Sequence, residues 1–394
     1  HRQSSAASDV YKRQYKLFDS ELNEIQREIQ EIDWEVSEAE KSGYDHFMYK
    51  EILEQSEVIE RTLSGRLEAS SDEIPIKLNE ASKFEKIWIV ACGTAYHAGL
   101  FGKDLFEKVL GVPVSVELAS EFRYREPIVG KNDLGIVISQ SGETMDTIAA
   151  TELLKENGSH VLALVNVVGS SLARMADSVF YLHVGPEIGV ASTKAYLGML
   201  VSQLVIAKHW DAENKLDVSF DEIAELPKLI DHTMACEGQI KEISEKIYKK
   251  NDIYFIGRGL DYALAAEGAL KLKEISYLHA EALAAGELKH GTLALIEKGT
   301  PVIVTASQNH LLDKTTSNVQ EVIARGAYVI AIGDSESEKL ENISDDYVTL
   351  PDSNEILTTV ISIIPLQFIA YHVANKNGQS IDQPRNLAKS VTVE

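Results

Sequence analysis

From residue 86 onward, short apolar segments alternate with longer segments whose apolar residues recur at helical spacing. In the first half of the chain, the short segments are candidate strands at 87–91, 114–117, 135–139, 160–165 and 178–184. Strands of this length, separated by segments long enough for a helix, are typical of βαβ units. The alternation therefore predicts an α/β fold in which a parallel sheet is covered by helices on both faces.

The same order of elements restarts at Asp252, after a predicted helix at about 191–210. Gly259 corresponds to Gly93 at an offset of 166 residues, and this offset also pairs other identical residues. The further pairs are Tyr96 with Tyr262, Gly102 with Gly268, Ala119 with Ala285 and Glu121 with Glu287. The predicted strand at 302–306 matches the one at 135–139 when one inserted residue is allowed. Self-similarity at a fixed spacing indicates a repeat, so we expect two copies of one α/β domain.

The segment before residue 86 has a different composition. Residues 1–14 are polar and basic, and we expect them to be foreign or processed sequence outside the fold. Residues 15–75 are rich in Glu, Lys, Gln and Ile at helical spacing, which predicts one or two exposed helices. We therefore divide the chain into an N-terminal region at 1–75, a first domain at 76–230, and a second domain with the C-terminal tail at 231–394. We also expect the chain to be part of a longer protein.

Charge and cysteine content exclude several classes of protein. The 394 residues carry a formal net charge of −23, which argues against partners such as nucleic acid and anionic membrane surfaces. The two cysteines, Cys92 and Cys236, lack metal-ligand spacing, and so few thiols fit a reducing cytoplasm. We find no run of about 18 apolar residues and no signal peptide. We therefore expect a cytoplasmic protein that uses no metal and no cofactor.

The segment 139–144, with the sequence SQSGET, lies between a predicted buried strand and a predicted helix at 145–155. Such a turn gathers hydroxyl groups and backbone N–H groups at a helix N-terminus, where the helix dipole favours an anion such as phosphate. The alternative is an ordinary polar turn with an N-cap. The second copy has the sequence ASQNH at 306–310, without the Gly and the Thr, so we expect the phosphate site in the first copy.

A strong helix is predicted at 261–278, and it places Glu267, Lys271 and Glu274 on one face. A carboxylate beside an ammonium group on a partly buried face is a candidate acid–base pair. The alternative is a solvated pair that contributes a few tenths of a kcal/mol to helix stability.

Two further candidates lie outside regular elements. His290 is in a turn between glycines, and imidazole titrates near neutrality, which suits proton transfer; a structural role is the alternative. The tail after Pro384 lacks low-complexity sequence and can fold over a site. Within it, Lys389 is a candidate amine nucleophile for a carbonyl if it is shielded from water, and a surface lysine on a frayed end if it is not.

Together these stretches resemble the isomerase half of the glutamine–fructose-6-phosphate amidotransferase family, the glucosamine-6-phosphate synthases. The resemblance covers the chain from about residue 45 to its end, and its tail is more specific than the phosphate loop, which other sugar-isomerase-domain proteins share. The segments that carry the resemblance are 91–94 (ACGT), 117–125 (ELASEFRYR), 139–144 (SQSGET), 187–194 (EIGVASTK), 270–290 and 383–394.

The resemblance implies two tandem sugar isomerase (SIS) domains, each a parallel sheet between helices in a flavodoxin-like, three-layer αβα arrangement. It also implies a set of ligand contacts. The implied phosphate contacts are Thr94, Ser139, Gln140, Ser141 and Thr144, and the implied sugar contacts lie near Val190, Ser192 and Ala388.

The resemblance assigns roles to four residues. Lys389 would form a Schiff base with open-chain fructose 6-phosphate, and Glu274 would move a proton between C1 and C2 with help from Lys271. His290 would open the sugar ring and would come from the neighbouring subunit of a homodimer. A single carboxylate that transfers one proton contributes about 10²–10⁴-fold to a rate, and no metal is required.

The implied activity is that of the synthase module, which converts fructose 6-phosphate to glucosamine 6-phosphate. The resemblance also implies interconversion of fructose 6-phosphate and glucose 6-phosphate. Ammonia would come from an N-terminal glutaminase domain, which we do not find before residue 45. Ala95 stands where the family usually has Ser, so one side-chain hydroxyl group that would contact the phosphate is missing, and we expect weaker phosphate binding. Thr292 stands where Pro is common in the family. The alternatives are a deglycase for fructosamine 6-phosphates and a non-catalytic sugar-phosphate sensor.

Overall fold

The computed structural model describes residues 7–9, 14–18, 22–25, 40–68 and 71–392, and it separates the chain into two units, 1–33 and 34–394. The first unit contains an antiparallel sheet with the order β1 (Ala7–Asp9), β2 (Gln14–Phe18), β3 (Glu24–Ile25). The prediction of helix from residue 15 onward is therefore wrong for residues 15–18 and 24–25, where Leu17 pairs with Ile25 across two strands. Residues 26–39 lie outside the described residues.

The second unit begins with α1 (Phe47–Leu53), α2 (Gln55–Leu63) and the short helix α3 (Leu78–Ala81). Helices are found here as predicted, but α1 and α2 are packed rather than exposed. Met48, Ile52, Val58 and Ile59 are fully buried, because the apolar stripe of α1 and α2 closes the shared core described below.

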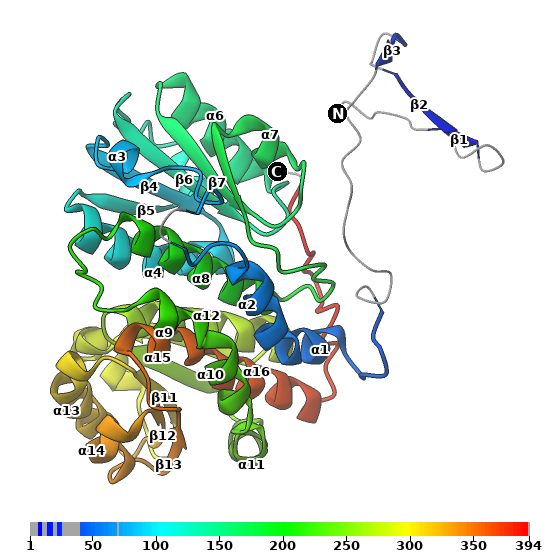
Figure 1. Ribbon diagram of the computed structural model, residues 1–394. Coiled ribbons are helices and arrows are strands. Elements are labelled where there is room, and N and C mark those ends of the chain that lie inside the picture. The colour runs from blue at the N-terminus through cyan, green and yellow to red at the C-terminus, as the bar shows by residue number, and fades with distance from the viewer. Residues whose placement is uncertain (1–6, 10–13, 19–21, 26–39, 69–70, 393–394) are drawn as a thin grey trace. The chain divides into compact units, whose positions relative to one another are not determined.

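The first copy of the repeat is a parallel sheet with the strand order β5-β4-β6-β7-β8 (Figure 1). All five strands predicted from the sequence are present, within a few residues at their ends. The elements are β4 (Lys86–Ala91), α4 (Gly93–Leu110), β5 (Val114–Leu118), α5 (Ala119–Phe122), β6 (Asp133–Ser139), α6 (Met145–Glu156), β7 (His160–Val165), α7 (Ser171–Met175), β8 (Ser178–Tyr181) and α8 (Lys194–Trp210).

Three helices connect the first copy to the second: α9 (Phe220–Ala224), α10 (Leu226–Met234) and α11 (Glu237–Ile247). The second sheet is also parallel and has the order β10-β9-β11-β12-β13, which is the strand order of the first sheet; the two-copy prediction is therefore confirmed. Its elements are β9 (Asp252–Gly257), α12 (Leu260–Ser276), β10 (His279–Ala284), η2 (Ala285–His290), η3 (Thr292–Leu295), β11 (Pro301–Ala306), η4 (Asn309–Leu311), α13 (Leu312–Ile323), β12 (Tyr328–Gly333), η5 (Ser335–Ser337), α14 (Glu338–Glu341), β13 (Asp346–Thr349), α15 (Glu355–Ile361) and α16 (Ile363–Lys376).

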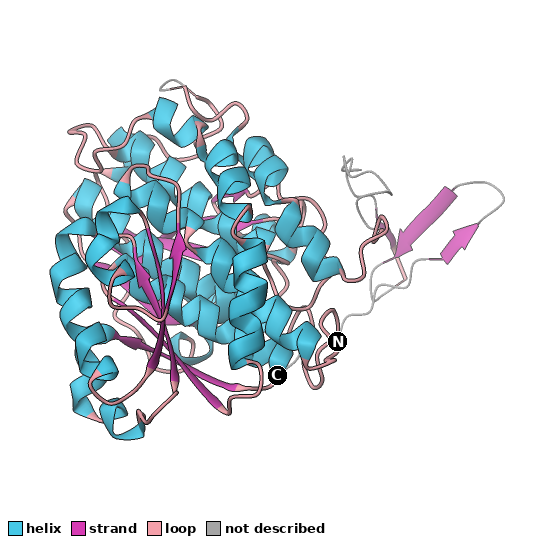
Figure 2. Ribbon diagram, turned by 90° about the horizontal axis from the view of Figure 1, so that it is seen from below, coloured by secondary structure: helices cyan, strands magenta, loops and turns pink. Residues whose placement is uncertain are grey.

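One apolar core lies between the two sheets and belongs to both copies. In β4, Ile87 and Ile89 face this shared core, while Trp88 and Val90 face a separate core under α6 and α7, as the two-residue period of a strand requires. Helices α4, α8, α12 and α16 fill the space between the sheets, and the strands lie between layers of helices in Figure 2. The helix α12 of the second copy packs directly on α4 of the first, which brings side chains of the two copies together.

Within the described part of the chain, the segment Glu355–Lys376 is long and apolar enough to cross a membrane, with a mean hydropathy of 1.7 over its best window. Thr and Ser interrupt its sequence, so the search for a continuous apolar run missed it. That window is entirely buried inside the fold, where α16 packs against α11 and α12. A helix that is apolar on all sides fits the centre of a protein as well as a membrane, and here protein surrounds it.

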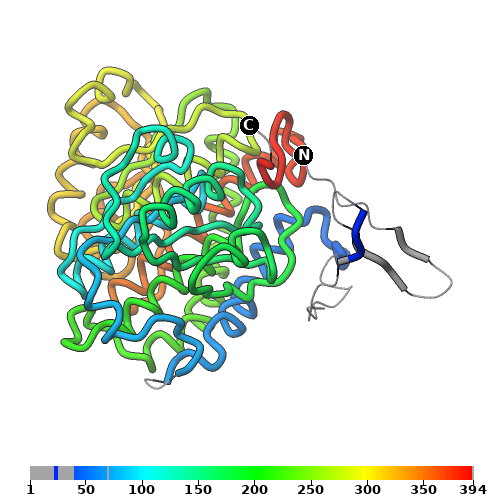
Figure 3. Tube along the Cα trace, turned by 90° about the horizontal axis from the view of Figure 1, so that it is seen from above, coloured from blue at the N-terminus to red at the C-terminus, as the bar shows by residue number. Residues whose placement is uncertain are grey.

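The segment after α16 leaves the second copy and returns to the first (Figure 1). Asp382 holds it there: its carbonyl oxygen accepts the N–H of Val190 at 3.0 Å, and its Oδ1 accepts the N–H of Met48 at 3.1 Å. Figure 3 shows this red segment beside the green segment that follows β8. The C-terminal tail, residues 382–392, therefore lies over the first copy.

Candidate active site

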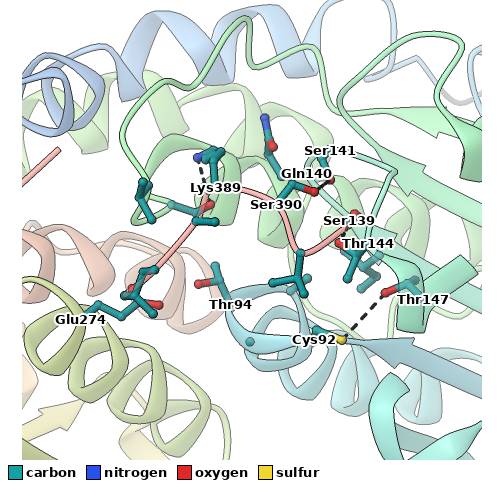
Figure 4. Close-up of a pocket in the computed structure, with 18 of the residues that line it drawn as sticks. Cys92, Thr94, Ser139, Gln140, Ser141, Thr144, Thr147, Glu274, Lys389 and Ser390 are labelled. Atoms are coloured by element: carbon teal, nitrogen blue, oxygen red, sulfur yellow. Dashed lines mark hydrogen bonds between the residues drawn. The ribbon is translucent and has the colours of Figure 1, made fainter. Parts of the chain in front are cut away.

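A pocket of about 310 Å³ lies at the carboxyl ends of β4 and β6 (Figure 4). The strand order reverses between these two strands, and α/β sheets bind ligands at such a point. Side chains reach the pocket from the first copy, from α12 of the second copy, and from the tail. The lining residues are Cys92, Gly93, Thr94, Ala95, Ile138, Ser139, Gln140, Ser141, Thr144, Thr147, Val190, Ser192, Met199, Lys271, Glu274, Leu387, Ala388, Lys389, Ser390 and Val391.

The loop 139–144 is held by its own hydroxyl groups. Ser139 Oγ accepts the N–H of Gly142 at 3.0 Å, and Ser141 Oγ accepts the N–H of Glu143 at 3.2 Å. The N–H of Met145, at the start of α6, donates to the carbonyl oxygen of Val391 in the tail at 3.2 Å. These three N–H groups therefore have acceptors within the chain. The sequence predicted that N–H and hydroxyl groups would hold an anion together, but in the structure the side-chain hydroxyl groups are the more available of the two.

Gly142 is required by the geometry of this loop. Its φ is +65°, and a Cβ atom at this position would lie 2.1 Å from Ser170 Oγ. We expect Gly142→Ala to lower the free energy of unfolding by about 2–4 kcal/mol, because it adds backbone strain and a steric clash, and to weaken binding of any ligand held by the loop. Urea unfolding and ligand titration measure the two effects.

Gly238→Ala is the matched control, because Gly238 lies in α11 with open space around its Cβ position. This change should leave stability unchanged or raise it by up to about 1 kcal/mol. Equal effects of the two substitutions would contradict the role given to Gly142.

The second copy contributes a buried ionic cluster. Lys271 Nζ lies 2.7 Å from Glu274 Oε2 and 3.3 Å from Glu267 Oε1, and it donates to Thr94 Oγ1 at 3.0 Å. The Lys271 side chain is 1% exposed, so the alternative of a solvated surface pair is wrong. Burial alone would lower the pKa of Lys271, but the two carboxylates raise it above its ordinary value. The Lys271 side chain therefore stays protonated and holds a positive charge next to the Glu274 carboxylate.

Glu267 is the buried carboxylate that connects this cluster to the first copy. It is fully buried, accepts the Thr94 hydroxyl at 3.0 Å, and lies 2.8 Å from Nδ1 of His97. The Thr94 hydroxyl is thus engaged with the second copy, although Thr94 lines the pocket as predicted. The cluster connects α4 to α12 across the interface of the two copies.

Lys389 reaches the pocket from the tail and is held at three points. Its Nζ lies 2.5 Å from Glu187 Oε2 and donates to the carbonyl oxygen of Gly189 at 2.8 Å, with Ser192 Oγ at 3.4 Å. The alternative of a frayed surface lysine is therefore wrong. Burial opposes ionisation of Glu187, but the Lys389 ammonium and two backbone N–H groups outweigh it and lower the pKa of Glu187. A nucleophilic amine needs a free lone pair, so the Lys389 ammonium would have to lose a proton before it could attack a carbonyl, and Glu187 Oε2 is its nearest acceptor.

A second carboxylate supports this loop from α1. Glu51 is 2% exposed, and its Oε1 accepts the N–H groups of Ile188 at 2.5 Å and Gly189 at 3.1 Å. Burial, followed by the nearby Glu187, raises the pKa of Glu51 to about 7. Glu51 lies in the segment that the sequence analysis assigned to exposed helices, and nothing in its local pattern distinguished it.

The raised pKa of Glu51 has a consequence for stability. A group with a folded pKa above its ordinary 4.5 stabilises the fold fully below pH 4.5, and this contribution is lost as the pH rises through about 7. The loss has an upper limit of about 3 kcal/mol. We expect Glu51→Gln to flatten the fall in unfolding free energy between pH 5 and pH 8, as measured by urea unfolding. The exposed Glu60→Gln on α2 should leave that fall unchanged, and an unchanged slope in Glu51→Gln would contradict the assignment.

The structure does not bring every predicted residue to the pocket. Of the predicted site residues, Thr94, Ser139, Gln140, Ser141, Thr144, Val190, Ser192, Lys271, Glu274, Ala388 and Lys389 line it. His290 ends η2, is exposed, and does not line the pocket of its own chain. The described residues contain no cluster of His, Cys, Asp or Glu that could hold a metal ion.

Sequence reasoning missed Thr147, which lines the pocket one turn into α6 and lies 4.0 Å from Cys92 Sγ. The sequence could have indicated Thr147, because it lies three residues after the N-cap Thr144 and so in the first turn of the helix that follows the loop 139–144. Ala95, whose missing hydroxyl was expected to weaken a phosphate site, lines the same pocket.

Comparison with known proteins agrees with the repeat. A family model for the SIS domain matches residues 81–208 and 246–375. The C-terminal domain of glucosamine-fructose-6-phosphate aminotransferase from Francisella tularensis has a TM-score of 0.81 to this chain and 41% sequence identity, and the match covers 88% of this chain and all of that one. The chain belongs to the SIS domain family and, within it, to the C-terminal domains of this aminotransferase.

Full-length relatives extend beyond this pair of SIS domains. Glutamine–fructose-6-phosphate aminotransferase (isomerizing) from Clostridium tetani is 48% identical over 96% of this chain and 64% of its own length. The enzyme of the same name from Caldanaerobacter subterraneus is 50% identical over 94% of this chain and 62% of its own length. The chain therefore spans slightly less than two thirds of these relatives and corresponds to their SIS-domain part.

Proposed function

We propose that this pair of SIS domains is the isomerase and synthase module of a glutamine–fructose-6-phosphate aminotransferase. It would convert fructose 6-phosphate to glucosamine 6-phosphate with ammonia, and would interconvert fructose 6-phosphate and glucose 6-phosphate without it. One observation carries the proposal: the loop 139–144, the Lys271–Glu274 pair and Lys389 line one pocket although they come from the first copy, the second copy and the tail.

The hydroxyl and amide groups of Ser139, Gln140, Ser141 and Thr144 line the pocket beside the N-terminus of α6, whose dipole favours an anion, and this supports the binding of a phosphate group there. Val190, Ser192 and Ala388 line the same pocket and would contact the sugar. Anchoring the phosphate at one end fixes which carbons lie against the catalytic groups, and such positioning removes much of the entropic cost of reaction.

In the proposed reaction, Lys389 gives a proton to Glu187, attacks the C2 carbonyl of open-chain fructose 6-phosphate as the free amine, and forms a Schiff base with loss of water. Ammonia then displaces the Lys389 amine from C2, or water does so when ammonia is absent, which frees the lysine. Glu274 takes a proton from C1 and returns it at C2, so that C1 becomes the aldehyde carbon and C2 carries the amine, or the hydroxyl group when water was used. The Lys271 charge lies against Glu274 Oε2 at 2.7 Å and would stabilise the negative charge that moves during this transfer.

We propose that His290 acts on the pocket of a neighbouring subunit in a homodimer, where it would open the sugar ring. Its exposure, and its absence from the pocket lining of its own chain, support a role between subunits. Mixing His290→Ala subunits with Glu274→Gln subunits tests this: a mixed dimer would contain one site with both native residues, so activity should partly return. If the mixture stays as inactive as its parents, the shared site is wrong.

A glutaminase domain elsewhere in a longer protein would supply ammonia, so we propose such a domain as the natural partner of this module, and the cytoplasm as its location. The proposed chemistry uses no metal or other cofactor, since side chains supply each proton and the amine.

The decisive test incubates the purified chain with fructose 6-phosphate and follows glucose 6-phosphate by NMR, then repeats the reaction with ammonium chloride and follows glucosamine 6-phosphate. Unphosphorylated fructose is the control and should not react, because it lacks the anchoring group. Release of an amino acid from a fructosamine 6-phosphate would favour the deglycase alternative. Tight binding of fructose 6-phosphate without any turnover would favour the sensor.

A further inference from the structure

In the second SIS domain, a carboxylate of the chain occupies the place where the first domain has its pocket. Asp261, in the first turn of α12, is 1% exposed, and its side chain faces the residues that follow β11. The N–H of Ser307 donates to both carboxylate oxygens, at 3.2 and 3.1 Å, and Ser307 Oγ donates to Oδ1 at 2.7 Å. Gln308 Nε2 lies 3.5 Å from Oδ2.

The two domains can be compared residue by residue because their sheets have the same order. The strands β9 and β11 flank the reversal in the second sheet as β4 and β6 do in the first. The repeat offset of 166 residues relates Asp261 to Ala95, which lines the first pocket. Ala95 has no polar side-chain group at that position, whereas Asp261 places a buried carboxylate at the corresponding position of the second copy.

The surrounding groups form a closed set of donors and acceptors. Gln308 Nε2 also donates to the carbonyl oxygen of Arg258 at 2.7 Å, and Ser307 Oγ lies 2.6 Å from Thr359 Oγ1. Burial raises the pKa of Asp261 to about 6, although the donors of Ser307 and Gln308 oppose this rise. A buried carboxylate is costly unless donors satisfy it, so this arrangement is a built oxyanion site with its own occupant.

We propose that the second SIS domain retains an oxyanion site that the Asp261 carboxylate fills, so that each chain binds one phosphorylated ligand rather than two. The loop at 306–310 lacks the Gly and the Thr of the loop 139–144, and the Asp261 carboxylate takes the place of a ligand in this cradle. The second domain thereby stays packed without a ligand, and its helix α12 can hold Lys271 and Glu274 in place. Removal of the side chain should leave a site for a small oxyanion.

Formate is the probe, because Asp261→Ala removes a carboxylate of the size of formate and leaves the Cβ atom. We expect Asp261→Ala to have a lower melting temperature than the native chain, and sodium formate to restore it saturably by at least about 2 °C relative to sodium chloride of equal strength. A crystal of Asp261→Ala soaked in formate should show the anion against Ser307. Asp261→Asn is the matched control, because its amide keeps the volume filled, so formate should give it no such gain.

The comparison does not depend on the proposed activity, because the first-domain pocket is the same in all three proteins and formate bound there would shift them equally. If formate stabilises Asp261→Ala no more than the native chain and Asp261→Asn, the inferred site is wrong. If Asp261→Ala does not yield folded protein, Asp261→Ser is tested in the same way, and an equal formate response in Asp261→Ser and the native chain would again overturn the proposal.

Discussion

Glu274→Gln should abolish isomerisation of fructose 6-phosphate while leaving the sugar phosphate bound. Gln has the size of Glu and can still pack beside Lys271, but its amide cannot take a proton from C1. We expect the turnover number to fall by about 10²–10⁴-fold, which is the usual contribution of a positioned general base. Because the proposed anchor of the ligand is its phosphate at the loop 139–144 and not Glu274, the dissociation constant should change by less than about threefold.

The measurement is the rate of glucose 6-phosphate formation, together with exchange of the C1 proton with deuterated water. Glu152→Gln is the control for the same chemical change, because Glu152 is exposed on α6 and outside the pocket. Proton exchange at the native rate in Glu274→Gln would show that another group is the base, and would leave the pocket without its proposed chemistry.

Lys389→Ala should remove the covalent step. Its loss takes away both the amine and the ion pair with Glu187, so Lys389→Arg is needed beside it: an arginine can keep the ion pair but does not form a Schiff base. We expect both variants to lose turnover by about 10²–10⁴-fold. When the protein is treated with borohydride in the presence of fructose 6-phosphate, the reduced Schiff base should add the mass of the sugar phosphate to the native chain and not to either variant.

The exposed Lys376→Ala on α16 is the control and should keep both the adduct and the rate, because its ion pair with Glu245 lies on the surface. Native turnover in Lys389→Arg would mean that the positive charge on the tail, and not its amine chemistry, is what the reaction needs. An adduct that persists in Lys389→Ala would assign the covalent step to another lysine.

Contacts of Lys389 and Ser390 hold the tail at the pocket. In the described structure the ammonium group is bound by Glu187, Gly189 and Ser192, and the neighbouring Ser390 Oγ contacts Ser141 Oγ at 3.1 Å. A ligand phosphate at this loop would compete for the Ser141 hydroxyl. Substrate binding can therefore favour release of the tail contacts because it offers the same hydroxyl group a better acceptor.

The positions of the strands along the chain and the repeat followed from the sequence, because both depend on local pattern. Apolar segments at 87–91 and 253–256 must be buried wherever they occur, and the matching glycines Gly93 and Gly259 recur where each first strand turns into its helix. The same reasoning failed for residues 15–18 and 24–25, where a few apolar residues among polar ones did not distinguish a helix from a paired strand.

The sequence by itself determined which residues could do chemistry: a hydroxyl-rich loop at 139–144, one helix face with Lys271 and Glu274, and a lysine near the end of the chain. Only the tertiary structure decided that these three meet, since it packs α12 against α4 and returns the tail to the first copy. It also decided the state of each charge. Burial between two sheets, and contacts such as Glu187 with Lys389 or Asp261 with Ser307, join residues 46 to 202 positions apart, and desolvation depends on neighbours in space rather than in sequence.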